Sequence, residues 1–175
     1  YQNIGGNWNQ IGQDINGEDW GDQSGWSVSI SSDGNIVAIG THRNDGNTGN
    51  INDNRGRVSI YQNVGGSWSQ LGQDIDGQTS GDYSGHSVSL SSNGERIAIG
   101  SNGIDVYNGS GSDYVKIYEW DGSSWNQLGQ DIDGEDDDDK SGWSVSFSAD
   151  GNRIAIGAID NDGNTGDPDD DRGHV

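Results

Sequence analysis

The residues of this chain best suited to chemistry are the carboxylates and amides that cluster after Gly157. Asp160, Asp162, Asn164 and Asp169 place four oxygen-bearing side chains within residues 160–169. Hard cations such as Ca²⁺ bind oxygen ligands of this kind. The spacing begins like a calcium loop, but the glycines are displaced from the usual position and no closing Glu follows. The segment therefore predicts either a calcium site or a solvated acidic turn.

An earlier segment carries part of the same pattern. Asp45, Asn47 and Asp53 supply its oxygen-bearing side chains, whereas Arg43 stands at the position of Asp160. The calcium hypothesis and the acidic-turn alternative apply to this segment too. Calcium is the only cofactor that the sequence suggests.

Aromatic residues recur at two positions of the chain. Trp26, His86 and Trp143 share the first position, within related Ser-Gly-x-Ser-Val-Ser segments. The second position is a tryptophan each time, at Trp8, Trp68 and Trp125. Exposed aromatic rings stack well on sugar rings, so the first set predicts a glycan-binding surface. The alternative is that recurring rings with one polar handle fill the space between packed sheets.

The sequence does not favour catalysis. His42, His86 and His174 show no metal-ligand spacing and no obvious nucleophile partner. Carboxylate pairs are abundant, but an acidic chain supplies them by chance, and a glycosidase pair also needs a pocket. We expect no enzyme, with a secreted hydrolase as the weakest alternative.

These residues are carried by three copies of one repeat of about 58 residues. Tyr1, Tyr61 and Tyr118 mark the same repeat position, with spacings of 60 and 57 residues. A fixed period of this size defines a repeat architecture. The copies span residues 1–60, 61–117 and 118–175, and the first begins and the third ends within the third strand of the unit.

Length varies between copies only between Gly100 and Val115. Insertions and deletions collect in outward loops, so this segment is expected at the surface. It contains the single glycosylation sequon, which begins at Asn108 and makes that residue a candidate glycosylation site.

Each copy predicts four β-strands. Apolar residues alternate with polar ones, as Val28 and Ile30 do between serines, which is the period of a strand. Strands are expected at residues 27–31, 36–40, 58–62 and 68–75. The Asp33-Gly34 dipeptide suits a two-residue hairpin loop, and a Gly65-Gly66 turn reverses the chain before the last strand.

Four short antiparallel strands per unit, rich in glycine and free of helices, predict an all-β protein built of β-propeller blades. A β-solenoid is the alternative, but its coils are usually shorter. Val175 aligns with Val58 and Tyr1 with Tyr61, and three blades cannot close a ring. We therefore expect an incomplete ring that belongs to a longer propeller or is completed by oligomerisation.

The repeat resembles the FG-GAP repeats of integrin-α-like β-propellers, in the divergent form of bacterial and algal surface proteins. The resemblance rests on the Ser24-Gly25-Trp26 start, the strand at 37–40 and the Gly56-Arg-Val-Ser-Ile-Tyr61 strand. The resemblance implies extracellular adhesion or scaffolding and about seven blades. The calcium loop of that family is replaced here by a bare Asp-Gly or Asn-Gly turn, so its ligands correspond to no residue of this chain.

Composition narrows the partners. The net charge of −21 opposes binding to nucleic acid and to anionic membranes, and no apolar run is long enough to span a bilayer. We expect a non-catalytic, extracellular or cell-surface module for adhesion, scaffolding or filament assembly. Its partners would be further copies of the repeat, as well as surface proteins or glycans.

Overall fold

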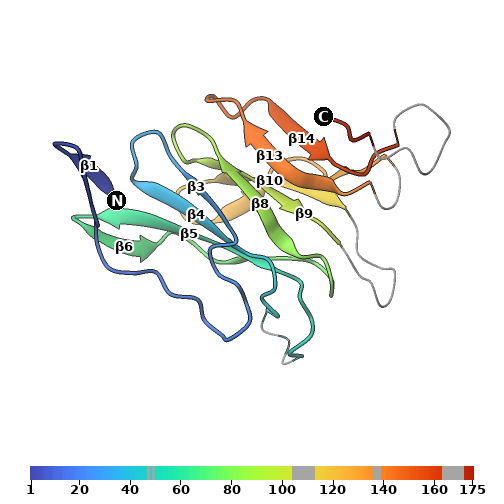
Figure 1. The fold of residues 1–175 in the computed structure, drawn as a ribbon, viewed down its shortest axis with the longest axis horizontal. Coiled ribbons are helices and arrows are strands. Elements are labelled where there is room, and N and C mark those ends of the chain that lie inside the picture. Colours follow the sequence, from blue (N-terminus) through green and yellow to red (C-terminus); the bar gives the residue numbers. More distant parts are fainter. Residues whose placement is uncertain (47, 49, 104–112, 136–138, 163–171) are drawn as a thin grey trace.

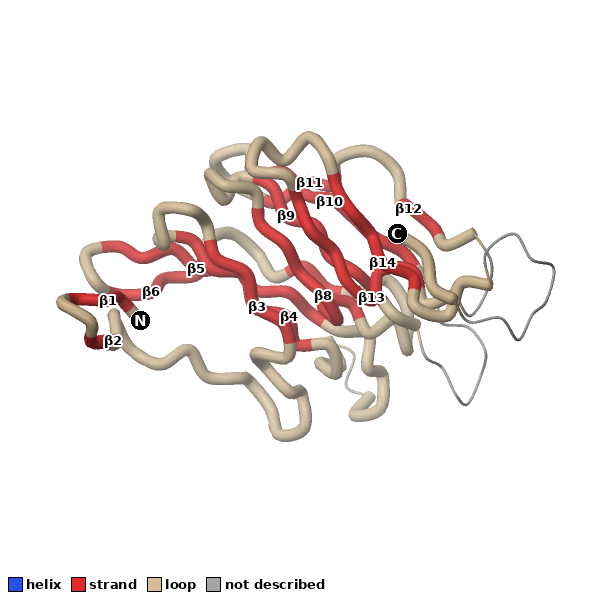
Figure 2. The backbone as a smooth tube through the Cα atoms, turned by 45° about the horizontal axis from the view of Figure 1, so that its top comes forward, coloured by secondary structure: helices blue, strands red, loops and turns tan. Residues whose placement is uncertain are grey.

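The structure is a computed structural model, which describes residues 1–46, 48, 50–103, 113–135, 139–162 and 172–175. The described residues form strands and no helix (Figures 1 and 2). They contain no helix long and apolar enough to cross a membrane. The prediction of an all-β protein is confirmed.

Two sheets contain most of the strands, and both run in sequence order with antiparallel neighbours. Sheet 1 comprises β3 (Ser27–Ile30), β4 (Ile36–Thr41), β5 (Arg57–Val64), β6 (Ser67–Gln70) and β7 (Ile75–Asp76). Sheet 2 comprises β8 (Ser84–Leu90), β9 (Arg96–Ser101), β10 (Tyr114–Trp120), β11 (Trp125–Gln127) and β12 (Ile132–Asp133). The predicted fourth strand is split, because β6 and β7 both pair with β5 but are separated by residues 71–74.

Two hairpins flank these sheets. The N-terminal hairpin pairs β1 (Gln2–Ile4) with β2 (Asn7–Asn9), and the C-terminal hairpin pairs β13 (Ser141–Phe147) with β14 (Ile154–Ala158). By sequence alignment they correspond to the last two and the first two strands of the repeat. The described strands do not close a ring (Figure 1).

The glycine turns follow two different geometries. Gly65 and Gly66 form a two-residue loop in which both φ angles are positive, as the sequence predicted. The Asp33-Gly34 prediction of a two-residue loop is wrong, because Ser31 pairs with Ile36 and four residues lie between them. Ser31 Oγ accepts a hydrogen bond from Ile36 N at 2.9 Å, which stabilises the wider turn.

Consecutive sheets stack face to face, and alternating residues assign each side chain to one face. We call the side of sheet 1 that contacts sheet 2 the trailing face; it carries Ala38, Gly40, Val58 and Ile60. The opposite side is the leading face; it carries Val28, Ile30, Val37 and Ile39. The same names apply to the equivalent residues of the other copies.

The hydrophobic core lies between sheets 1 and 2. Val58, Ile60 and Ile75 come from the trailing face of sheet 1, and they pack against leading-face residues such as Ile97 and Ile99 of sheet 2. Four of these five side chains are at most 1% exposed, and Ile75 is 5% exposed. Burial between sheets therefore supplies most of the apolar stabilisation of this glycine-rich chain.

Serines join the first strands of neighbouring units. Ser27 Oγ donates to the carbonyl oxygen of Gly85 at 2.7 Å, and Ser87 Oγ donates to that of Gly142 at the same distance. Ser29 Oγ in turn accepts from Leu90 N at 2.9 Å. The polar residues that alternate along the first strand thus make contacts between units and are not a solvated face.

Candidate functional site

Three of the sequence-predicted residues form an aromatic row across the starts of the first strands. The ring centroids of Trp26 and His86 lie 5.8 Å apart, and those of His86 and Trp143 lie 4.7 Å apart. His42 packs beside this set, with its ring 4.2 Å from that of Trp26 and 6.0 Å from that of His86. We call Trp26, His42, His86 and Trp143 the aromatic row.

The row depends on bulges in the first strands. In sheet 2 the register shifts between Ser84 and Ser87, so two residues, one of them His86, are inserted opposite β9. The same shift occurs between Ser141 and Ser144, beside Trp143. Bulges re-aim side chains at the rim of a sheet, and in these two units they accompany the close approach of His86 and Trp143.

The two histidine side chains of the row are uncharged at neutral pH, although the chain as a whole is acidic. Burial, together with smaller contributions from the nearby charges of His86 and Arg43, lowers the pKa of His42 to about 4. Burial also lowers the pKa of His86. Both imidazoles are therefore uncharged at neutral pH, and the row presents aromatic surface without a cation from its own histidines.

The two outer tryptophans of the row are open to solvent. Trp26 is 53% exposed and Trp143 is 37% exposed, whereas His42 is buried. The Nδ1 atoms of His42 and His86 are buried and have no hydrogen-bond partner among the described residues. This arrangement can stack on the flat face of a ligand such as a sugar, but neither histidine forms an ion pair with a carboxylate among the described residues.

The second set of recurring tryptophans joins neighbouring units, as the packing alternative predicted. Trp125 is buried, and its Nε1 donates to the carbonyl oxygen of Leu71 at 2.9 Å. Trp68 makes the same bond to Ile11 at 3.0 Å. Trp8 is different, because 70% of its surface is exposed.

A glutamine that the sequence analysis missed completes each of these joints. Gln73 Nε2 donates to the carbonyl oxygen of Trp125 at 2.8 Å, and Gln73 Oε1 accepts from Trp125 N at 3.2 Å. Gln13 makes the same two bonds to Trp68. The signal was present in the sequence, since a glutamine follows each recurring tryptophan five residues later, at Gln13, Gln73 and Gln130.

The predicted calcium ligands fall partly outside the described residues. Asn47, Asn164 and Asp169 lie there, as does the candidate glycosylation site Asn108. Asp53 pairs with Arg55 at 2.7 Å, and Asp160 pairs with Lys140. Within the described part of the chain, no group of three or more His, Asp or Glu residues is arranged to hold a metal ion, and the calcium site stays a prediction.

Asp45 has a structural partner in the same region. Its Oδ1 accepts a hydrogen bond from Asn54 N at 2.9 Å, which closes the loop after β4. Asp162 also interacts with its surroundings. Asp45 therefore helps to shape its own loop.

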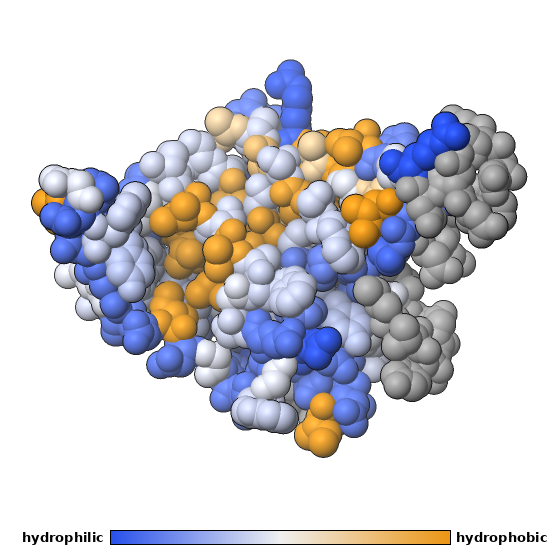
Figure 3. Space-filling model, in the orientation of Figure 1, coloured by the Kyte–Doolittle hydropathy of each residue, from blue (hydrophilic) through white to orange (hydrophobic). Residues whose placement is uncertain are grey.

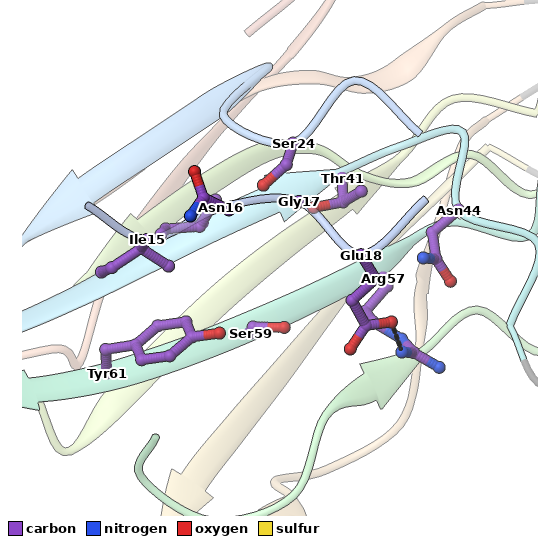
Figure 4. Close-up of a pocket in the computed structure, with 11 residues that line it drawn as sticks. Ile15, Asn16, Gly17, Glu18, Ser24, Thr41, Asn44, Arg57, Ser59 and Tyr61 are labelled. Carbon is purple, nitrogen blue, oxygen red and sulfur yellow. Dashed lines mark hydrogen bonds and ion pairs between the residues drawn. The ribbon is translucent and has the colours of Figure 1, made fainter. Parts of the chain in front are cut away.

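A shallow hollow lies on the leading face of sheet 1, between residues 15–18 and strands β4 and β5 (Figure 4). Arg57 donates to Glu18 Oε2 and to Asp76 Oδ1, both at 2.6 Å. Burial, together with nearby carboxylates, raises the pKa of Tyr61 at the other end. The hollow thus contains an arginine whose charge is balanced by carboxylates and a tyrosine that stays protonated. Such a pair suits structural packing better than acid–base chemistry.

No protein-family model matches the chain, and no curated protein matches it either. The resemblance to FG-GAP repeats accordingly stays a prediction.

Proposed function

We propose that this chain is a non-catalytic, β-propeller-type module that serves extracellular adhesion or scaffolding by joining further copies of its own repeat. The observation that carries the proposal is the reuse of one interface. The trailing face of sheet 1 covers the leading face of sheet 2, and sheet 2 covers the C-terminal hairpin in the same way. Such stacking extends by adding identical units.

The two outer faces of the described stack support this proposal, because the first strand of each is exposed on that face and the two faces are complementary. Val28 and Ile30 on the leading face of sheet 1 are 64% and 60% exposed. Their equivalents in sheet 2, Val88 and Leu90, are 9% and 8% exposed because sheet 1 covers them. Figure 3 shows the resulting apolar patch over the first strands of sheet 1.

A tandem chain tests the proposal. Joining Val175 to Tyr1 of a second copy through Ser-Ile supplies the equivalents of Ser59 and Ile60, so one continuous third strand forms. We expect one cooperative unfolding transition with a Tm higher than that of the single chain by about 10 °C, because two open faces become covered. Differential scanning calorimetry measures both properties.

The matched control is a tandem joined by Ser alone. A one-residue change inverts every side chain of the strand relative to its sheet, so this joint should not raise the Tm. If the Ser-Ile tandem unfolds at the temperature of the single chain, the proposed stacking is wrong.

A second candidate function, glycan binding, is favoured by the aromatic row. The row places two exposed tryptophan rings next to His86, at 5.8 Å for Trp26 and 4.7 Å for Trp143. Trp20 is also fully exposed but belongs to no ring cluster, which makes it a suitable control residue.

A glycan array tests this second function. Binding should be lost by at least about tenfold in Trp26→Ala and in Trp143→Ala, since each removes a stacking platform. Trp20→Ala should bind like the unmodified chain. An array without hits, or equal loss in all three variants, argues against the row as a sugar site.

A further inference from the structure

An exposed surface lies beside the N-terminal hairpin, on the leading face of sheet 1. Gln13 and Trp68 hold this hairpin against sheet 1 through the same bonds by which Gln73 and Trp125 join sheets 1 and 2. The hairpin therefore lies where the outer strands of a preceding unit belong (Figure 1). The first two strands of that unit are the part that would cover Val28 and Ile30.

We propose that the C-terminal hairpin of a second copy of this chain docks in this space, so that two copies join head to tail. The inference rests on the proposed function and names its partner. β13 and β14 are the first two strands of a unit, and β1 and β2 are the last two. Together they form one four-stranded sheet from two chains.

The trailing face of the C-terminal hairpin has the chemistry that this contact requires. Gly40 and Gly100 lie where a Cβ would overlap the carbonyl oxygens of Gly85 and Gly142 in the following unit. Gly157 is their equivalent, and only Ser144 is close to it. Ser144 and Ser146 are exposed at the positions where Ser27 and Ser29 bond to the next first strand. This face thus repeats the established interface, and no described unit covers it.

The proposed contact also includes a tryptophan site, in which Trp8 of one copy lies against Leu128, Gly129 and Gln130 of the other. In the two joints within the chain, the equivalent glycine faces a tryptophan ring: a Cβ at Gly12 would lie 2.9 Å from the ring of Trp68, and one at Gly72 would lie 3.0 Å from the ring of Trp125. At Gly129, no described residue other than its two chain neighbours comes within 4 Å of the Cβ position. Trp8 of the second copy has the matching repeat position, and its indole is exposed.

In the joined state Trp8 Nε1 donates to the carbonyl oxygen of Leu128 in the other copy. Gln130 makes the paired bonds to the backbone of Trp8 that Gln73 makes to Trp125. Head-to-tail contacts form a closed ring when the rotations from each copy to the next add up to a full turn. Two copies contribute six units, which lies within the range of about four to eight blades known for closed propellers. We therefore expect a closed dimer.

Sedimentation velocity on the 175-residue chain tests the inference, from about 1 to about 100 µM and at raised salt to screen the acidic surface. We expect a concentration-dependent shift from monomer to dimer. Trp8→Ala and Gln130→Ala should each weaken the dimer by about tenfold or more, as residues at the centre of a contact do. Trp20→Ala is the matched control and should associate normally.

Complementation distinguishes head-to-tail joining from any symmetric contact. Val28→Glu blocks the leading face and Gly157→Ala blocks the trailing face, so each variant alone should be monomeric. A mixture should regain association, because one intact leading face meets one intact trailing face. Absence of this rescue, or dimers that tolerate both Trp8→Ala and Gln130→Ala, overturns the proposed contact.

The tandem chain separates this inference from the proposed function. A single chain that stays monomeric at the highest concentration, while the Ser-Ile tandem is stabilised, overturns the second copy as partner but leaves stacking of repeats intact. If the single chain stays monomeric and the Ser-Ile tandem is not stabilised, both the head-to-tail dimer and the proposed stacking of repeats are wrong.

Discussion

Buried aspartates show how single residues define the loops of this repeat. Asp82 is 1% exposed, and its Oδ2 accepts hydrogen bonds from Thr79 N at 2.9 Å and from Tyr114 Oη at 2.7 Å. Asp22 and Asp139 occupy the same repeat position, two residues before the Ser-Gly pair. Buried carboxylates are costly unless they are hydrogen-bonded, so each is tied to the loop that it orders.

The residue after each of these aspartates adopts a left-handed conformation. Gln23, Tyr83 and Lys140 have φ angles of 58°, 50° and 55°. Such values are uncommon for residues other than glycine, and three occurrences at one repeat position indicate a conformation enforced by the loop.

The first prediction concerns His42 and pH. Its pKa is lowered from 6.5 to about 4 by burial, with smaller contributions from His86 and Arg43. The unfolded chain therefore binds more protons between these two values, and stability is lost as the pH falls through this range. We expect the Tm to decrease from pH 7 to pH 4.5, with a shallower slope in His42→Gln. Thermal unfolding across this range measures it.

The control for this prediction is His174→Gln, which changes an exposed histidine near the C-terminus. His86 also has a lowered pKa, so some slope should persist in His42→Gln. An unchanged slope in His42→Gln contradicts the assignment.

At the scale of elements, the second strand of one unit approaches the first strand of the next unit closely, and this approach depends on a glycine in the second strand. Gly100 in β9 lies against Gly142 of β13, where a methyl group would overlap the backbone oxygen of that glycine. The φ angle of Gly100 is not positive, so the constraint comes from packing and not from backbone conformation.

The second prediction compares Gly100→Ala with Gly157→Ala. Gly100→Ala should lower the free energy of unfolding by about 3 kcal/mol, because backbone must move to admit the methyl group. Gly157 has the same repeat position but meets only Ser144, so its replacement should change stability by no more than about 0.5 kcal/mol. Urea unfolding of dilute protein, where chains are monomeric, measures both.

Equal losses of unfolding free energy in the two variants would show that the destabilisation arises within each hairpin and not between units. A loss confined to Gly100→Ala places it between units.

At the scale of the whole molecule, charge opposes compaction. The chain carries a net charge of −21, and only eight Lys and Arg residues offset its carboxylates. Several of these cations are already used, as in the ion pairs of Arg57 with Glu18 and Asp76. Self-repulsion of this kind weakens as salt screens it, within a Debye length of about 10 Å at 0.1 M.

The third prediction follows from this repulsion. The Tm should rise between low salt and about 0.5 M NaCl as the surface is screened. Thermal unfolding in NaCl, MgCl₂ and CaCl₂ at matched ionic strength separates screening from binding. Equal curves indicate screening alone and contradict the calcium sites, whereas an added rise that only Ca²⁺ produces, and that a chelator removes, supports them.

Much of the architecture follows from local pattern. Alternation of Val28 and Ile30 with serines predicts strands, the Gly65-Gly66 pair predicts a hairpin, and the threefold recurrence of Trp8 predicts a repeat. The strand bounds agree closely, apart from the split between β6 and β7. Local pattern suffices here because strand period and positive-φ turns are properties of neighbouring residues.

The candidate site was predicted only as a set of repeated positions. Trp26, His86 and Trp143 were identified from recurrence, but His42 lies at an unrelated repeat position and joins them only through the packed loops. Asp74 illustrates the same limit. Its Oδ1 accepts hydrogen bonds from Gln70 Nε2 at 2.7 Å and from Ser59 Oγ in β5 at 2.6 Å, and the contact with Ser59 depends on strand pairing.

The sequence by itself determined the strands, the repeat and the alternation of faces, because these depend on residues close together in the chain. Only the tertiary structure decided which face is covered. Val28 and Val88 occupy the same repeat position with the same neighbours, yet one is 64% exposed and the other 9%. The difference arises because sheet 1 covers Val88, whereas no described sheet covers Val28. Burial thus depends on the neighbouring unit, which no local pattern contains.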